Sequence, residues 1–321
     1  MLPVAVDALG GDKAPAEILA GAKQAASEGI PILLVGPADL ADRGNLPLHV
    51  ATEFIDMHEE PANAVRTKKD STLVRSAELV RDGVASAMIS AGNTGATMAS
   101  ALLRMGRIKG VKRPAIATPI PVPGSTPTVL LDAGANAEVE APWLTQFAMM
   151  GTVYAKARFG IANPRVGLLS IGEEPGKGDS LRKEAYELLG AASGINFIGN
   201  VEGRDIMTDD VDVVVTDGFT GNVTLKTLEG TMKTVVKALF AAISEPQYKE
   251  HADALMPALF GLYGQFDPDT YGGAILLGVD GVCIISHGSS SARAMLNGIK
   301  VAKEMVDCNM VGLIAEALHT E

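Results

Sequence analysis

Short apolar runs alternate with stretches of helical periodicity along almost the whole chain, and this alternation limits the fold more than any other feature. Leu2 to Ala8 and Ala87 to Ser90 are apolar runs that end at small residues. Amphipathic patterns typical of helices cover Ser71 to Asp82 and Glu138 to Arg158. Strands that alternate with helices form a mostly parallel sheet with helices on both faces. We therefore predict an α/β fold whose ligands bind beyond the carboxyl ends of the strands.

No Pro-, Gly- or Ser-rich linker divides the chain. Its 321 residues are enough for one large α/β domain or for two lobes that meet near residue 133. We predict a single domain over residues 1–321, with an apolar helical hairpin near residues 240–266. A helix is expected from Val223 to Ile243, with Asn222 as its cap.

Three of the predicted strands run into a turn that is rich in small residues, contains asparagine and opens a helix. These turns are Ser90 to Gly95, Asp132 to Asn136 and Asp217 to Asn222. Glycine lets backbone N–H groups approach a ligand, and the start of a helix adds positive partial charge. Each turn alone is also ordinary strand-to-helix punctuation. Because all three follow strands, we expect them to form a shared site for an anion, phosphate above all.

Backbone N–H groups must supply most donors of such a site, since a carboxylate that lined it would repel the anion. Asp7, Asp132 and Asp217 at strand ends are expected to orient those donors. The loop that follows the first strand is expected to complete the site. The predicted phosphate- or substrate-binding residues are Gly10, Gly11, Asp12, Lys13, Gly92, Thr94, Gly95, Asp132, Gly218 and Gly221.

Several classes of protein are disfavoured by composition and spacing. A formal charge of −11 argues against a nucleic-acid binder. The G-x-G-x-x-G fingerprint is missing after the first strand, and the loop Gly172 to Asp179 lacks P-loop spacing. His and Cys residues show no metal-ligand clustering, so we predict neither metal nor cofactor. Cys283 is expected in the core, and with only two cysteines and no visible leader we expect a cytoplasmic protein.

For two polar features, the residues alone leave more than one role possible. His287 follows a strand and precedes a Gly/Ser turn, which suits proton transfer or anion binding as well as a turn histidine bonded to backbone. A basic run interrupts the acidic chain, and such a run is typical of a solvated face or of a docking site for an acidic partner. Its members are Arg104, Arg107, Lys109, Lys112 and Arg113.

The segment Leu255 to Tyr263 is markedly apolar and contains both Pro and Gly. A core helix or a dimer contact would explain this pattern. A surface hairpin that enters lipid or guides an acyl chain is the functional alternative. The side chains predicted to make that contact are Leu255, Leu259, Phe260 and Leu262.

Seven segments together resemble one bacterial family, the phosphate acyltransferases of phospholipid synthesis (PlsX proteins). They occur in the family's order and cover nearly the whole chain, and Leu9 stands where the family usually has Met. The resemblance implies an isocitrate/isopropylmalate dehydrogenase-like fold related to phosphotransacetylases, a homodimer, and peripheral contact with the inner face of the cell membrane. The segments are residues 7–15, 90–96, 131–136, 199–203, 217–222, 271–274 and 287–290.

The implied reaction joins inorganic phosphate to the acyl group of acyl-acyl carrier protein, giving acyl-phosphate and the carrier thiol. Dianionic phosphate attacks a thioester without a strong base, so the enzyme mainly positions the reactants and stabilises the oxyanion. Asn93, Asn136 or Asn222 are candidates to hold the thioester oxygen, and His287 is the candidate proton donor to the thiol. The acidic carrier protein would give the basic run a partner.

Three other functions compete with this interpretation. A phosphotransacetylase-like enzyme would use acyl-CoA as the donor. A hydride-transferring dehydrogenase would bind NAD, and a scaffold for lipid-synthesis enzymes would have no phosphate-dependent activity.

Overall fold

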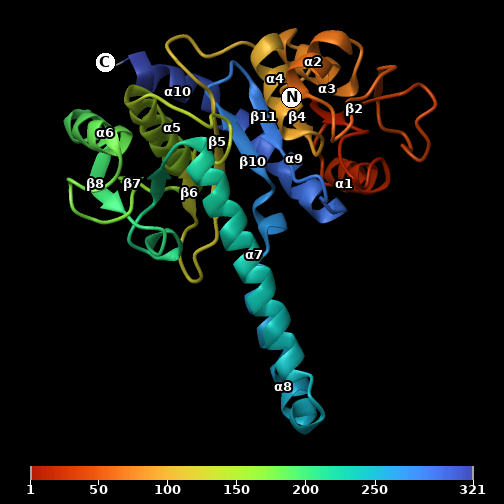
Figure 1. Ribbon diagram of the computed structural model, residues 1–321. Coiled ribbons are helices and arrows are strands. Elements are labelled where there is room, and N and C mark those ends of the chain that lie inside the picture. The colour runs from red at the N-terminus through yellow and green to blue at the C-terminus, as the bar shows by residue number, and fades with distance from the viewer. Residues whose placement is uncertain (1, 320–321) are drawn as a thin grey trace.

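The computed structural model describes residues 2–319, which form one continuous sheet flanked by helices (Figure 1). The strand order is β3-β2-β1-β4-β11-β10-β5-β6-β9-β7-β8. Most neighbouring strands are parallel, so the predicted α/β fold with a mostly parallel sheet is confirmed. The strands are β1 (Val4–Asp7), β2 (Ile32–Gly36), β3 (Leu48–Val50), β4 (Ala87–Ser90), β5 (Ala115–Ile120), β6 (Thr128–Leu131), β7 (Arg165–Leu169), β8 (Asn196–Val201), β9 (Val213–Val215), β10 (Ala274–Leu277) and β11 (Val282–Ile285).

The direction of the strands reverses in the middle of the sheet. β10 is antiparallel to both β11 and β5, and β5 is antiparallel to β6. As a result, β3, β2, β1, β4 and β11 run one way, whereas β6, β9, β7 and β8 run the other. The carboxyl ends of these two groups of strands therefore lie at opposite edges of the sheet.

Helices connect many of the strands, and several of these helices begin at a side chain that caps them. Ser71, Asn93 and Asp179 each accept a backbone N–H of the first helical turn. The helices are α1 (Ala16–Ser27), α2 (Pro61–Thr67), α3 (Thr72–Arg81), α4 (Thr94–Arg104), α5 (Ala141–Phe159), α6 (Ser180–Ala191), α7 (Gly218–Ile243), α8 (Lys249–Phe266), α9 (Ala292–Asp307) and α10 (Met310–His319), with short 3-10 turns η1 (Asp205–Met207), η2 (Pro246–Tyr248) and η3 (Pro268–Tyr271).

The start of α7 corrects one prediction. The helix begins at Gly218, five residues before the predicted start, and its cap is Asp217 rather than Asn222. Oδ1 of Asp217 accepts the N–H of Thr220 at 2.8 Å. A carboxylate at the first position of the turn reaches that donor, so the helix starts there and Asn222 lies within it.

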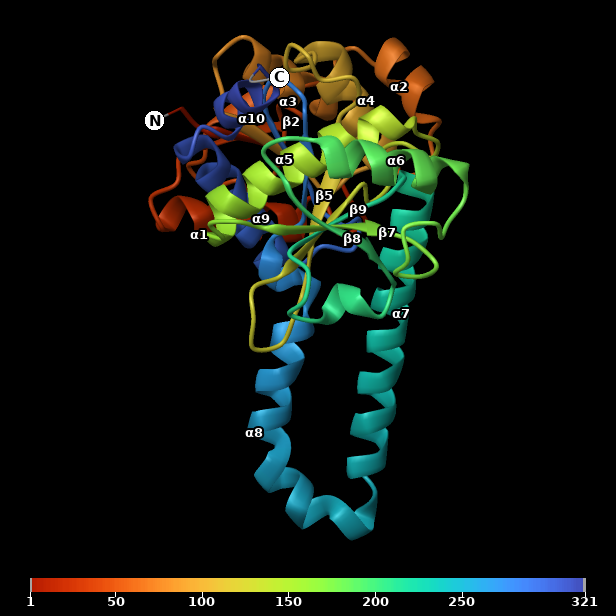
Figure 2. The ribbon, with the colours of Figure 1, turned by 90° about the vertical axis from the view of Figure 1, so that its left-hand side faces the viewer.

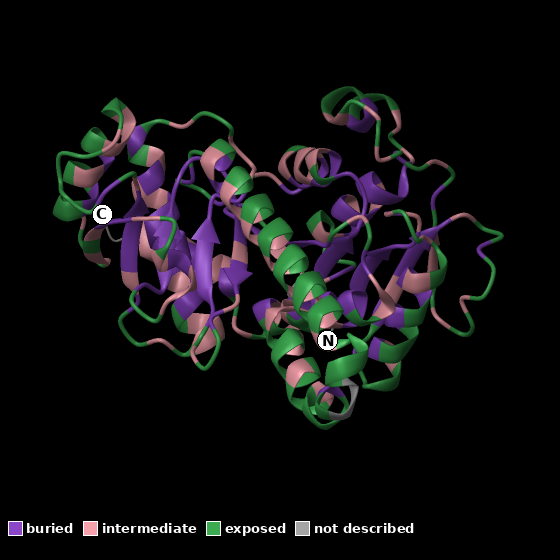
Figure 3. Ribbon diagram, turned by 60° about the horizontal axis from the view of Figure 1, so that its bottom comes forward, coloured by how far each residue is buried: buried purple, intermediate pink, exposed green. Residues whose placement is uncertain are grey.

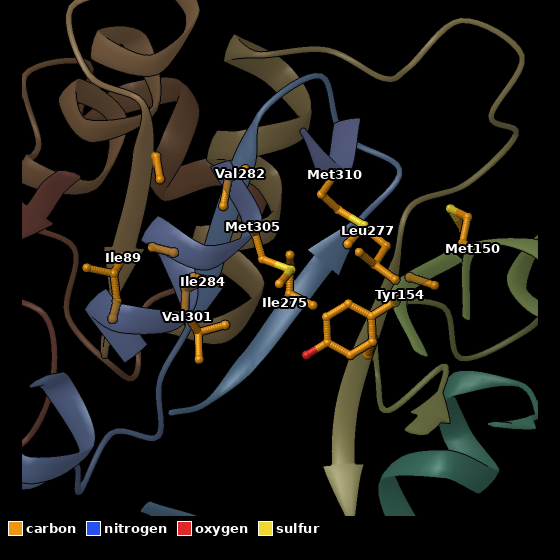
Figure 4. Packing of buried hydrophobic residues seen from close by; sticks show 14 of the residues in the cluster. Ile89, Met150, Tyr154, Ile275, Leu277, Val282, Ile284, Val301, Met305 and Met310 are labelled. Atoms are coloured by element: carbon orange, nitrogen blue, oxygen red, sulfur yellow. The ribbon is translucent and has the colours of Figure 1, made fainter. Parts of the chain in front are cut away.

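Both faces of the sheet are buried, which accounts for the nearly uninterrupted apolar runs of its strands. Alternate residues contribute to the two sides: Ile89 packs into one apolar cluster and Met88 into the other. On the first side, Ile275 and Ile284 meet Met305 of α9 (Figure 4). Cys283 is buried, as predicted, and burial raises the pKa of its thiol to about 12.

Two helices, α7 and α8, leave the body as a long hairpin, which we call the arm (Figures 1 and 2). The 26 residues of α7 correspond to about 39 Å, yet only Gly218 and Gly221 are buried within the chain. The arm is therefore mostly exposed, in contrast to the sheet (Figure 3). Phe240 and Phe260 connect its helices, with ring centroids 5.5 Å apart.

Candidate anion site

Loops from four parts of the chain meet at the carboxyl ends of β1, β4 and β11, and we call this group the cradle. It consists of residues 9–13, 57–61, 91–95 and 287–289. The Asp12 N–H donates to the carbonyl of Gly288 at 2.8 Å. Nδ2 of Asn93 donates to the carbonyls of Met57 and Glu59, each at 3.0 Å. The structure thus brings together two segments predicted for the phosphate site, residues 10–13 and 92–95, with His287.

Glycine is required where these loops touch. A Cβ at Gly10 would lie 2.6 Å from Oδ2 of Asp7 and 2.7 Å from Oγ of Ser90. Gly11 has a φ of +107°, and a Cβ there would lie 3.0 Å from the carbonyl oxygens of both Ala91 and Gly288. Side chains at these positions would push the turns apart.

Beneath the cradle lies a buried pair, Asp7 and Ser90. Oγ of Ser90 donates to Oδ2 of Asp7 at 2.7 Å and accepts the Gly92 N–H at 2.9 Å. Burial raises the pKa of Asp7, although hydrogen bonds from Thr72, Ser90, Leu9 and Gly10 oppose this shift. The sequence indicated that Asp7 orients donors, but it gave no sign that Ser90 is its intermediary.

Several backbone donors of the cradle are unused. Within residues 2–319, the N–H groups of Gly11, Asn93, Thr94 and Gly95 meet no acceptor. Thr94 is exposed and opens α4, so the positive end of that helix adds to the attraction for an anion. The Asn93 side chain, by contrast, is fully engaged: Oδ1 accepts the Ala96 N–H at 3.0 Å, and Nδ2 holds residues 57–59. Both N–H groups of this amide are thus bonded within the chain, and the contact of Asn93 with a thioester oxygen stays a prediction.

His287 lies on the exposed side of the cradle. Its Nδ1 accepts the N–H of Ser289 at 3.3 Å and lies 2.8 Å from Oγ of the same residue. A ring nitrogen that accepts an N–H is unprotonated, so the neutral ring carries its proton on Nε2. Nε2 is therefore the nitrogen that can donate to a ligand.

A second group of turns, residues 132–136 and 217–222, lies at the carboxyl ends of β6 and β9, and we call it the latch. Its centre is Asp132, which is fully buried. Oδ1 accepts the N–H groups of Ile116, Gly134 and Ala135 at 2.8–3.0 Å. Oδ2 accepts both N and Nδ2 of Asn136, at 2.7 and 2.9 Å. Burial raises the pKa of Asp132 against these five bonds.

In the latch, N–H groups that the sequence assigned to phosphate are already hydrogen-bonded within the chain. Nδ2 of Asn136 also donates to the carbonyl of Pro114 at 2.8 Å, and the Gly218 N–H donates to the carbonyl of Asn136 at 2.7 Å. Gly221 packs directly on the Asp132 carbonyl. Asn222 is exposed and donates to the carbonyl of Ala133 at 3.2 Å. The side chains of Asn136 and Asp132 therefore hold the turn together, and the catalytic role of Asn136 and the phosphate contact of Asp132 stay predictions.

An ion pair fastens the start of α7 to this group. Arg182 of α6 reaches Asp217, Thr216 and Thr220 through Nη2. Burial alone would raise the pKa of Asp217. Hydrogen bonds from Thr220 and the charge of Arg182 outweigh it and hold the pKa below its usual value.

The prediction that all three turns share one site is also wrong. β4 and β6 are separated by β11, β10 and β5, and they run in opposite directions. Four interstrand spacings of about 4.8 Å place the two turns roughly 19 Å apart across the sheet. One phosphate cannot reach both, and only the cradle has unused backbone donors in several adjacent positions.

The basic run lies at the far end of α4 from the cradle, which is about 16 Å along an 11-residue helix. Arg104 pairs with Glu78 at 3.7 Å, and the guanidinium of Arg113 lies 4.9 Å from the centroid of the Trp143 ring. Arg107, Lys109 and Lys112 are exposed. The run thus borders the latch, whose Asn136 contacts Pro114.

Two features are absent from residues 2–319. No three or more His, Cys, Asp or Glu side chains come together as a group that could hold a metal ion. None of the helices in this part of the chain combines the length and the apolar character that crossing a bilayer requires.

Comparisons with known proteins give a consistent result. The family described as fatty acid synthesis protein matches residues 2–312. The chain is 48% identical to a phosphate acyltransferase of Pelotomaculum thermopropionicum, over 99% of this chain and 96% of that protein. It is 47% identical to a phosphate acyltransferase of Desulfitobacterium hafniense, over 99% and 98% of the two chains.

Solved structures resemble the fold at low sequence identity. A phosphotransacetylase from Staphylococcus aureus has a TM-score of 0.62 at 17% identity, with 95% and 94% of the two chains covered. A 4-hydroxythreonine-4-phosphate dehydrogenase from Klebsiella pneumoniae has a TM-score of 0.55 at 14% identity, with 95% and 100% covered. These likenesses concern the fold alone.

Proposed function

The chain belongs to the family of fatty acid synthesis proteins, and on that basis we propose that it transfers an acyl group from acyl-acyl carrier protein to inorganic phosphate. Its relatives of 47–48% identity carry the name phosphate acyltransferase. The observation that best supports the proposal is the set of unused N–H groups at Gly11, Asn93, Thr94 and Gly95. These donors suit an anion and lie on the same group of loops as His287.

In the proposed reaction, phosphate is held by the cradle and one of its oxygens attacks the thioester carbonyl carbon. The C–O bond forms, the C–S bond breaks, and the electron pair leaves with the sulfur as thiolate. Backbone N–H groups that point at the developing oxyanion supply the main stabilisation. Nε2–H of His287 lies on the exposed side and donates a hydrogen bond to the leaving thiolate, which takes its proton from the attacking hydrogen phosphate. Cys283 takes no part, because it is buried and its pKa is about 12.

Release of free thiol tests the proposal directly. Purified protein is mixed with acyl-acyl carrier protein, and thiol is measured with and without inorganic phosphate. We expect thiol release that depends on phosphate and forms acyl-phosphate in equal amount. Equal or faster turnover with acyl-CoA would favour a phosphotransacetylase-like enzyme, and no phosphate dependence with either donor would favour a scaffold. Binding of NAD would favour a dehydrogenase.

The carrier protein is proposed to dock on the basic run, whose exposed members Arg107, Lys109 and Lys112 contrast with the net charge of −11. The double variant Arg107→Glu/Lys112→Glu should raise KM for the carrier substrate. A matched control is Lys23→Glu/Lys156→Glu, which changes the net charge equally at two exposed positions elsewhere. Equal KM values for the two double variants would contradict docking of the carrier protein on the basic run.

The arm is proposed to serve a homodimer and a lipid surface. Val235 and Leu239 of α7 are 54% and 40% exposed, and Leu255 and Phe260 of α8 are 55% and 57% exposed. These exposures exclude a core position within the chain. A second copy would cover part of this apolar face, and lipid at the inner face of the cell membrane would cover the rest.

Flotation with vesicles separates the two occupants of the arm. Leu259→Glu/Phe260→Glu should lose vesicle binding while keeping a dimeric mass by light scattering. Gln247→Glu/Gln265→Glu adds the same charge to the arm at polar exposed positions and should still float. If Leu259→Glu/Phe260→Glu floats as well as the wild type, the proposed lipid contact is contradicted. If the wild type has a monomeric mass, the proposed homodimer is contradicted.

The fold is proposed to be of the isocitrate/isopropylmalate dehydrogenase type and to act as one domain of two lobes in the cytoplasm. The reversal of strand direction at β10, β5 and β6 supports two lobes within one sheet.

A further inference from the structure

We propose that Ser90 is a positioning residue of the cradle: its hydroxyl, anchored on Asp7, holds the Gly92 N–H and thereby sets the direction of the free donors at Asn93, Thr94 and Gly95. This inference rests on the proposed function, since it assigns those donors to phosphate.

The Ser90 hydroxyl has one arrangement that satisfies its neighbours. Ser90 is 0% exposed and Asp7 is 2% exposed, so neither can exchange its partner for water. An ionised carboxylate can only accept, so with Asp7 ionised the Ser90 proton points at Oδ2, 2.7 Å away. The lone pairs of Oγ are then left for the Gly92 N–H at 2.9 Å.

This contact determines the path of the turn. With the Gly92 N–H turned inward to Ser90, the carbonyl of Ala91 faces Gly11, whose Cβ position lies 3.0 Å from that oxygen. The next three N–H groups then enter the first turn of α4 without an acceptor. Loss of the Ser90 hydroxyl would leave a buried N–H unpaired, and the 91–92 peptide would be free to rotate.

Asp7 extends the same control to the neighbouring loop. Its Oδ1 accepts the Leu9 N–H at 3.2 Å, and the Gly10 N–H also bonds to the carboxylate. The Asp7–Ser90 pair thus holds both glycine turns of the cradle at once. A displacement of either turn by about 1 Å is enough to weaken catalysis strongly.

Thr72 provides a matched control for Ser90. It lies at the start of α3, is 1% exposed, and bonds to the same Asp7 carboxylate through its side chain. Within residues 2–319 it makes no hydrogen bond to either glycine turn. A role limited to holding Asp7 in the fold would make Thr72 and Ser90 equivalent, whereas positioning of the donors requires Ser90 alone.

The test compares Ser90→Ala with Thr72→Val in the thiol-release assay, with inorganic phosphate varied, and measures phosphate affinity by calorimetry. We expect Ser90→Ala to raise both KM and Kd for phosphate at least 10-fold, with KM for the acyl donor within twofold. Thr72→Val should leave both phosphate constants within twofold at a comparable loss of thermal stability. Ser90→Cys, which keeps a weak acceptor, should fall in between and serves where Ser90→Ala does not fold.

Two results would overturn the inference, provided that the wild-type enzyme turns over. One is a KM and Kd for phosphate in Ser90→Ala equal to those of the wild type. The other is an equal rise of these constants in Ser90→Ala and Thr72→Val. Absence of phosphate-dependent thiol release by the wild type would instead overturn the proposed function.

Discussion

The cradle and the latch are built on nearly the same sequence pattern and use it in opposite ways. One turn reads Ser90-Ala91-Gly92-Asn93 and the other Asp132-Ala133-Gly134-Ala135-Asn136. Ser90 takes a single backbone donor, from Gly92. Asp132 takes the N–H groups of Gly134, Ala135 and Asn136, so its turn has none left for a ligand.

The difference lies in the acceptor at the first position of the turn. A hydroxyl that already donates to Asp7 can satisfy one N–H, whereas two carboxylate oxygens satisfy several. A glycine-rich turn after a strand is therefore a candidate anion site only when the residue that opens it leaves its donors unused. Four predictions test this contrast, in order of decreasing effect.

Asp132→Ala should cost the most. It leaves up to five donors around a buried position without their acceptor, so we expect the free energy of unfolding to fall by on the order of 4 kcal/mol. Urea denaturation measures this change, and the phosphate KM of the folded fraction should stay within twofold. A large rise in phosphate KM without loss of stability would identify the latch as the anion site.

Thr94→Pro should lower kcat/KM for phosphate about 100-fold, a typical cost of losing one such donor. Thr94 is the first residue of α4, where proline is tolerated, and Asn93 has φ −54° and ψ 114°, which suits a residue before proline. Thermal stability should therefore change little. Ser180→Pro makes the same exchange at the exposed start of α6 and should leave the kinetics unaffected; equal kinetics in both variants would argue against the cradle.

Asp217→Asn tests the ion pair with Arg182 through its pH dependence. The folded-state pKa of Asp217 lies below its usual 3.8, so the ionised carboxylate stabilises the fold above that pH. We expect the variant to be less stable by about 2 kcal/mol at neutral pH. As the pH falls below 3.8 through the folded pKa, the difference from wild type should disappear; a constant difference would show that the charge is not responsible.

Asn222→Ala should have the smallest effect. The side chain is exposed and makes one hydrogen bond of 3.2 Å, so we expect a loss below about 1 kcal/mol in unfolding and a kcat/KM within twofold of wild type. A loss of activity near 100-fold would restore Asn222 to the role of oxyanion donor.

The sequence predicted the alternation of strands and helices because that signal is local, and it predicted the turns at strand ends for the same reason. It did not predict which turns meet. The signal was present in part: the strands that became β5 and β6 are joined by the Pro- and Gly-rich loop of residues 121–127 without a helix, and strands joined in this way are antiparallel. The sequence could not show which acceptor each donor group bonds to, because the partners are far apart in the chain. The bond of Ser90 to Asp7 joins residues 83 positions apart, and that of Asn93 to Met57 joins residues 36 positions apart.

A crystal structure with inorganic phosphate tests the central claim most directly. We predict the anion within hydrogen-bond distance of the backbone nitrogens of Thr94 and Gly95, with Gly11 and His287 beside it. Phosphate bound instead among Gly218, Asn222 and Asn136, with the cradle empty, would contradict the assignment of the site to the cradle.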